Sequence, residues 1–431
     1  MSSSAGLVAR DLASVWHPFT QHAGWPTDDP LVVERAEGMY LYDVDGRGYL
    51  DGVSSLWVSV HGHRVPEIDD AVRAQLDRIA HSTFLGLTHE PGIVLAEKLL
   101  ATAPPGLSRV FYCGDGATAV EAALKMAYQS AAQRGEDRPL FVGVREGYHG
   151  DTLGAVSVGA IDTFHATYRQ ILLETRSIAS PAFARSGAEA SLAELERILD
   201  AEGERVCAVA VEPMVQGAGG MLTHDATFLR GVRELCTRHG ALMLADEVAT
   251  GLGRTGRMWA VEHADVTPDL LTLGKGVTAG YLPLSAVLAN EAVYESFLGS
   301  PESGRTFFHG HTYTGNPLAC AAAIANLDLM EARGTVAAAA RAGDRLGAIL
   351  EPLRALDGVV DIRRCGTMTG IEVASLETRT GFEVCRRARA QGVLIRPLGD
   401  VVVLMPPLAM GDADIDLLGS VVVDAVREVV G

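Results

Sequence analysis

The stretch Leu242-Met-Leu-Ala-Asp-Glu-Val-Ala-Thr-Gly-Leu-Gly-Arg-Thr-Gly256, followed by Leu270-Leu-Thr-Leu-Gly-Lys-Gly276, decides the fold. Each segment opens with a short apolar run that predicts a buried strand, and the two strands end beside Asp246 and Lys275. In an open α/β sheet, ligands bind beyond the carboxyl ends of the parallel strands. We therefore expect the carboxylate of Asp246 and the amine of Lys275 to face one crevice.

A lysine in such a crevice can form a Schiff base with a carbonyl compound once its pKa is lowered. A buried aspartate such as Asp246 needs a cation, and a protonated pyridine nitrogen would supply one. A protonated pyridine is also the electron sink of pyridoxal phosphate chemistry. Taken alone, Lys275 and Asp246 fit a surface lysine and a helix-capping aspartate equally well, so the rest of the chain has to decide.

Short apolar strands and amphipathic helices alternate around this stretch. The pattern is typical of an α/β fold with a mostly parallel sheet covered by helices on both faces. The predicted strands span residues 109–113, 140–144, 208–212, 241–246, 270–273 and 285–289. The predicted helices between and around them span residues 67–79, 91–101, 120–132, 190–201, 227–239 and 317–333.

A chain of 431 residues is too long for one compact core. We expect a large domain over residues 61–330 and a smaller α+β domain built from residues 1–60 and 331–431. Residues 1–30 are predicted to be irregular, and residues 31–51 to form strands. In the tail, the predicted strands span residues 359–363, 370–373, 393–396 and 401–405, with helices between them.

Composition excludes several classes of protein. The formal charge of −18 argues against binding to nucleic acid or to an anionic membrane. The six cysteines are scattered without a CxxC pair, which argues for a reducing compartment and against a structural zinc site. The sequence has neither a leader-like N-terminus nor an apolar run long enough to span a membrane. We expect a cytoplasmic protein whose partners are small molecules.

Other polar motifs follow strands of the same predicted sheet. Gly114-Asp-Gly-Ala-Thr118 lies between a strand and a helix, where backbone N–H groups and the helix dipole favour a phosphate. Tyr148 could stack on a flat ring, and Glu212 could orient a cofactor. Thr312 precedes a helix as a second possible phosphate contact, and Arg396 could hold a carboxylate through two hydrogen bonds. Each feature has an ordinary structural explanation, but together they indicate an active site.

These motifs resemble those of the class III, fold-type I, pyridoxal phosphate-dependent aminotransferases over nearly the whole chain. The motifs that carry the resemblance are Tyr148-His-Gly-Asp, Glu212-Pro, Asp246-Glu-Val, Gly251-Leu-Gly-Arg-Thr-Gly256, Leu273-Gly-Lys-Gly and Thr312-Tyr-Thr-Gly-Asn-Pro-Leu.

Within that class, three further stretches resemble the branch that converts 8-amino-7-oxononanoate to 7,8-diaminononanoate in biotin biosynthesis. They are Trp16-His-Pro-Phe-Thr, His81-Ser-Thr-Phe-Leu-Gly-Leu-Thr-His-Glu-Pro91, and Arg396-Pro-Leu-Gly-Asp with Met405-Pro-Pro.

The resemblance implies a role for each residue. Lys275 would carry the cofactor and transfer the proton, Asp246 would pair with the pyridine nitrogen, and Tyr148 would lie near the ring. Gly116, Ala117 and, from the second subunit of a homodimer with shared active sites, Thr312 would bind the phosphate. Arg396 would hold the substrate carboxylate. Trp57 and Phe19 would line the slot for the substrate chain, with Gly310 and Asp151 nearby and Glu212 at the cofactor.

The amino donor of this branch is usually S-adenosylmethionine, but four residues instead resemble those of a branch that includes members that use L-lysine. Phe19 stands where users of S-adenosylmethionine tend to have Tyr, Leu56 where they have Trp, His311 where they have Pro, and Val403 where they have Tyr. A further departure is Asp115, since the phosphate turn of the family usually reads Asp-Ser-Gly-Ser or Asp-Ser-Gly-Ala. A carboxylate there would repel the phosphate unless it points away.

Three rival functions remain. An ω-amino-acid:pyruvate aminotransferase shares the central motifs but not the N-terminal and Arg396 stretches. A non-catalytic pyridoxal phosphate scaffold would not need Lys275, Asp246 and Arg396. Gly251-x-Gly253-x-x-Gly256 fits a dinucleotide-binding pattern literally, but a true one lies in the first strand–helix turn. An NAD-dependent oxidoreductase is therefore the weakest of the three.

Overall fold

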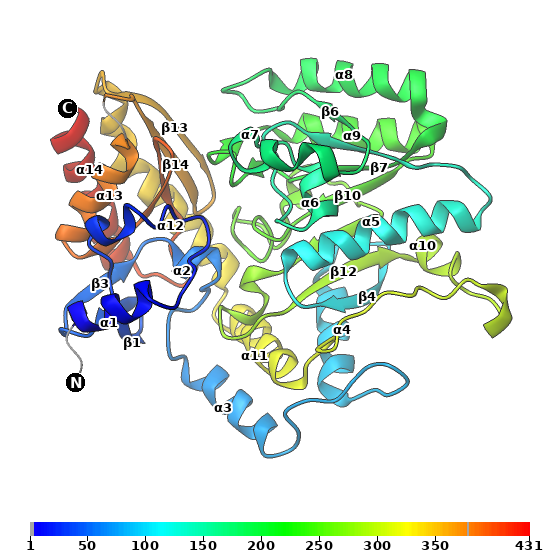
Figure 1. Ribbon diagram of the computed structural model, residues 1–431, viewed down its shortest axis with the longest axis horizontal. Coiled ribbons are helices and arrows are strands. Elements are labelled where there is room, and N and C mark those ends of the chain that lie inside the picture. Colours follow the sequence, from blue (N-terminus) through cyan, green and yellow to red (C-terminus); the bar gives the residue numbers. More distant parts are fainter. Residues whose placement is uncertain (1–3, 377–378) are drawn as a thin grey trace.

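The computed structural model of the chain describes residues 4–376 and 379–431. Two parts lie side by side, a larger part on a seven-stranded sheet and a smaller part that contains both ends of the chain (Figure 1). The large sheet has the strand order β4-β12-β11-β10-β7-β5-β6. Its strands are β4 (Leu107–Cys113), β5 (Leu140–Val144), β6 (Thr175–Ile178), β7 (Val206–Val211), β10 (Leu242–Asp246), β11 (Leu270–Leu273) and β12 (Ser285–Asn290).

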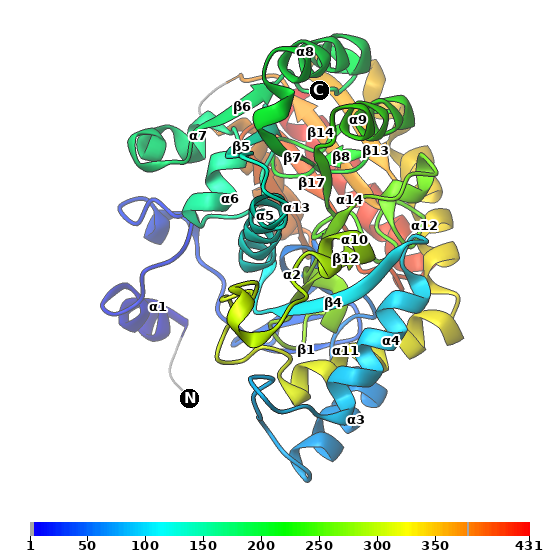
Figure 2. The ribbon, with the colours of Figure 1, turned by 90° about the vertical axis from the view of Figure 1, so that its right-hand side faces the viewer.

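Both faces of this sheet are buried, as the near-continuous apolar strands predict. Along β10, Met243 and Ala245 join one apolar cluster, while Leu244 joins the cluster on the opposite face. Helices α5 (Gly116–Gln133) and α6 (Leu153–Val158) cover the second face. The first face is covered by α3 (Pro66–Leu76), α4 (Glu90–Thr102), α8 (Gly187–Glu202), α9 (Ala226–His239) and α11 (Pro317–Ala332) (Figure 2).

The sheet is mostly parallel, as expected, and β12 is the strand that runs antiparallel to both of its neighbours. The prediction omitted β6, a four-residue edge strand that pairs with β5. Because β4 runs parallel to β10 and β11, their carboxyl ends meet at one edge of the sheet. The motifs that follow these strands therefore lie together.

The smaller part contains two four-stranded sheets, with the orders β1-β2-β3-β15 and β13-β14-β17-β16. Parallel pairing of β15 with β3 joins the N-terminal and C-terminal segments. The strands are β1 (Val33–Glu37), β2 (Tyr40–Asp43), β3 (Gly48–Asp51), β13 (Val359–Cys365), β14 (Met368–Val373), β15 (Val393–Leu394), β16 (Arg396–Leu398) and β17 (Val401–Leu404), packed against α12 (Thr335–Leu350), α13 (Thr380–Ala390) and α14 (Asp412–Val430). The division of the chain at residues 60 and 330 stays a prediction.

Two expectations about the smaller part were wrong. Residues 393–396 do not form one strand, because β15 pairs with β3 while β16 pairs with β17. Pro397 lacks an N–H group and therefore suits an edge strand, the position that β16 occupies. Residues 1–30 are not wholly irregular, since α1 (Ser4–Leu12) is a helix. None of its residues is buried in this chain, and nine residues are fewer than the window in which helical periodicity identifies a helix.

Among the residues that the structure describes, no helix has both the length and the apolar character that crossing a membrane requires.

Candidate active site

The carboxyl edge of the large sheet brings Asp246 and Lys275 together. Asp246 ends β10 opposite Thr272 of β11, and Lys275 follows β11 after Gly274. Both side chains line an inner lobe of about 490 Å³. A larger outer lobe of about 1130 Å³ shares Trp57, Tyr148 and Lys275 with it, so the two lobes form one crevice.

Lys275 sits on a strained backbone at the junction of the two lobes. Its φ of 42° lies in the left-handed region, which is unusual for a residue with a side chain and recurs at functional sites. Its Nζ lies 5.3 Å from the ring of Trp57, which is itself in a left-handed turn with Ser54, Ser55 and Leu56. Burial lowers the pKa of Lys275, although Asp246 and Glu212 act in the opposite direction. Formation of a Schiff base requires a neutral amine, and desolvation favours this form of Lys275.

Asp246 is oriented by three hydrogen-bond donors. Its Oδ1 accepts from the N–H of Val248 (3.1 Å) and the hydroxyl of Thr272 (2.9 Å), and its Oδ2 lies 2.7 Å from Nδ1 of His149. Burial is the largest influence on His149 and opposes its charge, but the hydrogen bond to Asp246 and the charges of Asp246 and Glu212 together outweigh it, so the pKa of His149 is raised. His149 was not predicted as a site residue, although its position next to Tyr148 in Tyr-His-Gly-Asp could have indicated it.

Glu212 connects two loops at the inner lobe of the crevice. Its two oxygens accept from the N–H groups of Tyr148 (2.9 Å) and Gly217 (3.0 Å), which belong to two different loops. Burial raises the pKa of Glu212 to about 7. The carboxyl group therefore ties the loop that carries Tyr148 to the glycine-rich loop after β7.

Tyr148 stands at the wall shared by both lobes. Its hydroxyl donates to Asp151 Oδ2 (2.8 Å), and burial, followed by this hydrogen bond, raises its pKa. Phe164 approaches the Tyr148 ring edge-on, with centroids 6.3 Å apart, and Phe19 contacts Phe164 in turn at 5.4 Å. Phe19 thus brings the N-terminal arm to the outer lobe.

The predicted phosphate turn forms the N-terminus of α5. Asp115 is the N-cap: its side chain accepts from the N–H of Thr118 (2.9 Å), and the Thr118 hydroxyl accepts from the N–H of Asp115 (3.0 Å). The N–H groups of Gly116 and Ala117 belong to the first turn, which has no intrahelical acceptor, and both residues line the inner lobe. The Asp115 carboxylate is thus committed to the cap.

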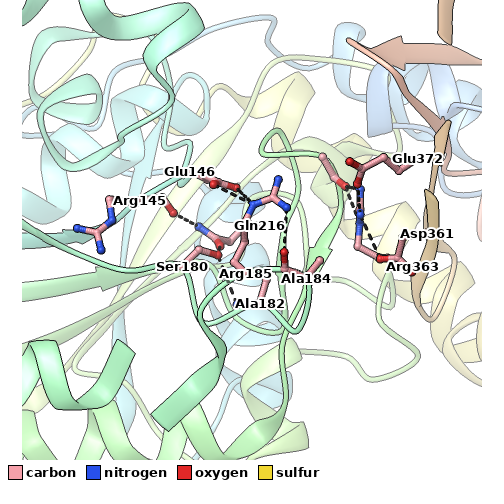
Figure 3. A network of polar contacts seen from close by, with 11 residues as sticks. Arg145, Glu146, Ser180, Ala182, Ala184, Arg185, Gln216, Asp361, Arg363 and Glu372 are labelled. Carbon is pink, nitrogen blue, oxygen red and sulfur yellow. Dashed lines mark hydrogen bonds and ion pairs between the residues drawn. The ribbon is translucent and has the colours of Figure 1, made fainter. Parts of the chain in front are cut away.

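Arg396 lines the outer lobe and differs from the other arginines there. The described residues offer its side chain no hydrogen-bonding or ion-pair partner. It lies in β16 with its side chain exposed. The other arginines of this lobe are neutralised: Arg145 by Glu194, Arg169 by Asp162, Arg176 by Glu202 and Arg185 by Glu146, the last pair being drawn in Figure 3. Arg396 is therefore free to bind an anion that enters the crevice.

Not every predicted site residue lies at the crevice. Trp57, Tyr148, Asp151, Glu212, Gly116 and Ala117 line the inner lobe with Asp246 and Lys275, and Phe19 and Arg396 line the outer lobe. Gly310 and Thr312 are exposed and line neither lobe of their own chain.

Arg254, which was not predicted as a site residue, is buried near Lys275. It donates to the carbonyls of Ser59 (2.8 Å) and Pro406 (2.6 Å), and burial lowers its pKa to about 9. The glycines around it precede a 3-10 helix, Ala260–His263, and not the long helix of a dinucleotide-binding turn.

The inner lobe fits pyridoxal phosphate. It offers an amine at Lys275, a buried carboxylate at Asp246, and free N–H groups at the positive end of α5 for a phosphate. Trp57 Nε1 is buried without a hydrogen-bonding partner in the described chain, as expected of a wall that packs against a ligand.

Comparison with known proteins defines the class. Residues 23–426 match the family model of the class III aminotransferases, and the chain belongs to this family. It is accordingly a pyridoxal phosphate-dependent transaminase.

Relatives within the family carry a more particular name. The adenosylmethionine-8-amino-7-oxononanoate aminotransferase of Nitratidesulfovibrio vulgaris is 50% identical, over 97% of this chain and 81% of that protein. A crystal structure of the enzyme of that name from Methanocaldococcus jannaschii has a TM-score of 0.95 at 37% identity, covering 99% of this chain and 100% of that one. A pyridoxal phosphate-bound amine transaminase of an uncultivated Pseudomonas species has a TM-score of 0.92 at 36% identity, covering 96% and 99%.

Proposed function

We propose that the chain is the aminotransferase that converts 8-amino-7-oxononanoate to 7,8-diaminononanoate in biotin biosynthesis, with S-adenosylmethionine as the amino donor. The observation that carries this proposal is the guanidinium of Arg396, which has no partner among the residues that the structure describes, in the same crevice as Lys275. A keto acid with a long apolar chain could place its carboxylate on Arg396 and its carbonyl near Lys275. Relatives named for this reaction, up to 50% identical, support it.

In the proposed mechanism, bound pyridoxal phosphate supplies the carbonyl that condenses with amines and a ring that withdraws electrons. Lys275 Nζ removes the proton from the amine-bearing carbon of the donor and later delivers a proton to the corresponding carbon of the acceptor. The lowered pKa of Lys275 suits a base that must be neutral. Asp246, held by Thr272, Val248 and His149, would keep a proton on the ring nitrogen.

The remaining residues would bind and orient. Gly116 and Ala117 would donate their N–H groups to the phosphate, and Glu212 would keep the Tyr148 loop against the ring. Trp57 and Phe19 would line the slot for the apolar chain, and Asp151 would hold the Tyr148 hydroxyl. Donor and acceptor would use the same crevice in turn, so we expect ping-pong kinetics.

We further propose a cytoplasmic homodimer with shared active sites. Exposed apolar side chains gather on the segments before α4 and before α11: Leu85 is 89%, Phe308 83% and Tyr313 67% exposed. A second copy of the chain could cover them. Gly310 and Thr312 lie in the same segment, so the partner's copies would reach this crevice although neither lines its own.

The test is a half-reaction followed by absorbance. S-adenosylmethionine, L-lysine, or an ω-amino acid is added in turn to the holoenzyme, and loss of the visible band of bound pyridoxal phosphate is recorded. Full turnover with 8-amino-7-oxononanoate is then assayed by mass spectrometry of the diamine.

We expect S-adenosylmethionine to convert the cofactor and the keto acid to restore it. Conversion by lysine alone would assign the donor to lysine, with Phe19, Leu56 and His311 as the residues to exchange. Conversion by ω-amino acids with pyruvate as acceptor, and no diamine product, would replace the proposal by the amine-transaminase alternative. A protein that binds the cofactor but reacts with none of these donors would be a scaffold.

A further inference from the structure

The two ends of the proposed substrate contact different sheets. Lys275 follows β11 of the large sheet, whereas Arg396 lies in β16 of the sheet β13-β14-β17-β16. The distance available to the substrate therefore depends on how this smaller sheet is held against the larger part.

One row of paired residues crosses the smaller sheet from edge to edge. Arg363 of β13 pairs with Gly370 of β14, Gly370 pairs with Val403 of β17, and Val403 pairs with Arg396 of β16. Directly paired residues of an antiparallel sheet project from the same face. Arg363 and Arg396 are thus the two ends of one rigid row across four strands.

Arg363 fastens its end of the row to the larger part. Its guanidinium is buried, and Nε and Nη2 donate to the carbonyl oxygen of Gly220 at 3.2 and 2.9 Å (Figure 3). Nη1 contacts Asp361 (3.2 Å) and Glu372 on its own sheet. A planar, always charged fork is suited to holding a carbonyl on one side and carboxylates on the other.

The segment that receives this contact is itself fixed to the larger part. Gln216 donates to the carbonyl of Arg145 (2.8 Å) and accepts from the hydroxyl of Ser180 (Figure 3). Gly217 donates to Glu212 (3.0 Å). The next residues, Ala218, Gly219 and Gly220, line the outer lobe of the crevice.

The middle of the row also touches this segment. A Cβ atom on Gly370 would lie 2.9 Å from Cβ of Met221 and 3.2 Å from the carbonyl oxygen of Gly220. The smaller sheet therefore packs directly against the Gly217–Met221 segment, and even a methyl group at residue 370 would push the sheet away from this segment.

We propose that Arg363 is a positioning residue that sets the chain-length selectivity of the enzyme, by fixing the span between Arg396 and Lys275. The inference rests on the proposed function, because it assumes a substrate that contacts both residues. Releasing Arg363 from Gly220 lets the row tilt, so that keto acids longer or shorter by one methylene fit almost as well. Arg363 itself lines neither lobe of the crevice and touches no substrate.

The test compares three variants of the holoenzyme. Arg363→Gln removes the guanidinium group, and Gly370→Ala displaces the sheet while leaving the Arg363 guanidinium in place. Arg364→Gln is the matched control: this neighbour in β13 is exposed and bonds to Asp344 and the carbonyl of Gly366 within the smaller part. Arg363→Lys, which keeps the charge opposite Asp361 and Glu372, replaces Arg363→Gln if the latter fails to fold.

Two readouts are taken. One is kcat/KM for 8-amino-7-oxononanoate against homologues one methylene shorter and longer. The other is calorimetric binding of octanoate, nonanoate and decanoate to the holoenzyme, which needs no turnover. We expect the wild type and Arg364→Gln to discriminate by about tenfold per methylene, a magnitude typical of shaped apolar slots. For Arg363→Gln and Gly370→Ala, the discrimination between keto acids that differ by one methylene should fall to about threefold or less, mainly through changes in KM. The rate of the donor half-reaction should change by less than about twofold.

Equal selectivity in Arg363→Gln, Gly370→Ala and Arg364→Gln would overturn the proposal. A wild type that makes no diamine would instead overturn the proposed function. The carboxylate series would still report whether the preferred length depends on Arg363, so the two failures are distinguishable.

Discussion

At the residue scale, the buried environment of Lys275 suits its proposed role as a base. Burial lowers its pKa below the ordinary lysine value of 10.5, so a larger fraction of neutral amine is present at any pH below that value. We expect the rate at which the apoprotein captures pyridoxal phosphate to rise with pH through a midpoint below 10.5. Stopped-flow absorbance measures this profile, and a midpoint at or above the ordinary lysine value would contradict the assignment of Lys275 as a desolvated amine. Lys275→Ala should abolish the capture.

Arg396 provides a second prediction at this scale. Two charge-assisted hydrogen bonds to a carboxylate are lost in Arg396→Gln, so KM for the keto acid should rise by about 10- to 100-fold with a smaller change in kcat. Steady-state kinetics with the keto acid varied at fixed donor concentration measures it. Arg185→Gln is the control, because Arg185 lines the same lobe but is already paired with Glu146. If both variants have the same KM, the carboxylate binds elsewhere.

Glu247, next to Asp246, allows a pH prediction for stability. Burial raises its pKa to about 7 from 4.5, so between these values the folded protein holds a proton that the unfolded chain releases. The contribution of this residue to the free energy of unfolding is therefore lost as pH rises from about 4.5 to about 7. The free energy of unfolding of Glu247→Gln, relative to that of the wild type, should therefore increase by about 3 kcal/mol between about pH 4.5 and about pH 8. Urea unfolding at both pH values measures it, and a pH-independent difference would refute it.

At the element scale, the N-terminus of α5 combines a cap with the proposed phosphate site. Asp115→Asn keeps a side chain that caps as well as aspartate but removes the negative charge beside the proposed phosphate. We expect the free energy of unfolding to change by less than about 0.5 kcal/mol. Pyridoxal phosphate should bind a few-fold more tightly, because a repulsion of roughly 1 kcal/mol is removed. Fluorescence titration of the apoprotein and thermal unfolding report the two effects. Asp115→Ala, which loses the cap as well, should be less stable by about 1 kcal/mol.

The short strands β15 and β16 follow each other along the chain but belong to two different sheets. Val393–Leu394 extends the N-terminal sheet, and Arg396 lies in the next sheet two residues later. This arrangement allows one segment to hold the two chain ends together and to present Arg396 to the crevice.

At the scale of the whole molecule, the proposed dimer predicts complementation between inactive variants. Lys275→Ala lacks the amine, and Thr312→Asp would place a negative charge against the phosphate of the partner's site. Each homodimer should be inactive. A mixture unfolded and refolded together should regain activity, up to about a quarter of wild type, because one site of each mixed dimer carries neither change. Size-exclusion chromatography with light scattering supplies the oligomeric state. No recovery in a mixture of proven dimers would exclude a shared site.

The sequence by itself determined the class of fold and the inner lobe. Apolar strands that end in Asp246 and before Lys275 predict where the sheet edge lies, because the carboxyl ends of parallel strands converge there. The glycine turn before α5, the Tyr148 loop and Glu212 follow from the same rule and were predicted in chain order. Helix α1 was missed because its nine residues fall short of the window in which helical periodicity is recognised, and strand β6 because its four residues include one apolar side chain.

Only the tertiary structure decided which charges are free and what holds the two parts together. Every arginine has the same sequence signal, yet Arg396 has no partner among the described residues, while its neighbours in the crevice meet carboxylates from distant segments. His149 on Asp246 and Arg363 on Gly220 join residues 97 and 143 positions apart. Such contacts depend on how folded elements pack against one another, and hydrophobic periodicity along the chain records only which face of each element is buried.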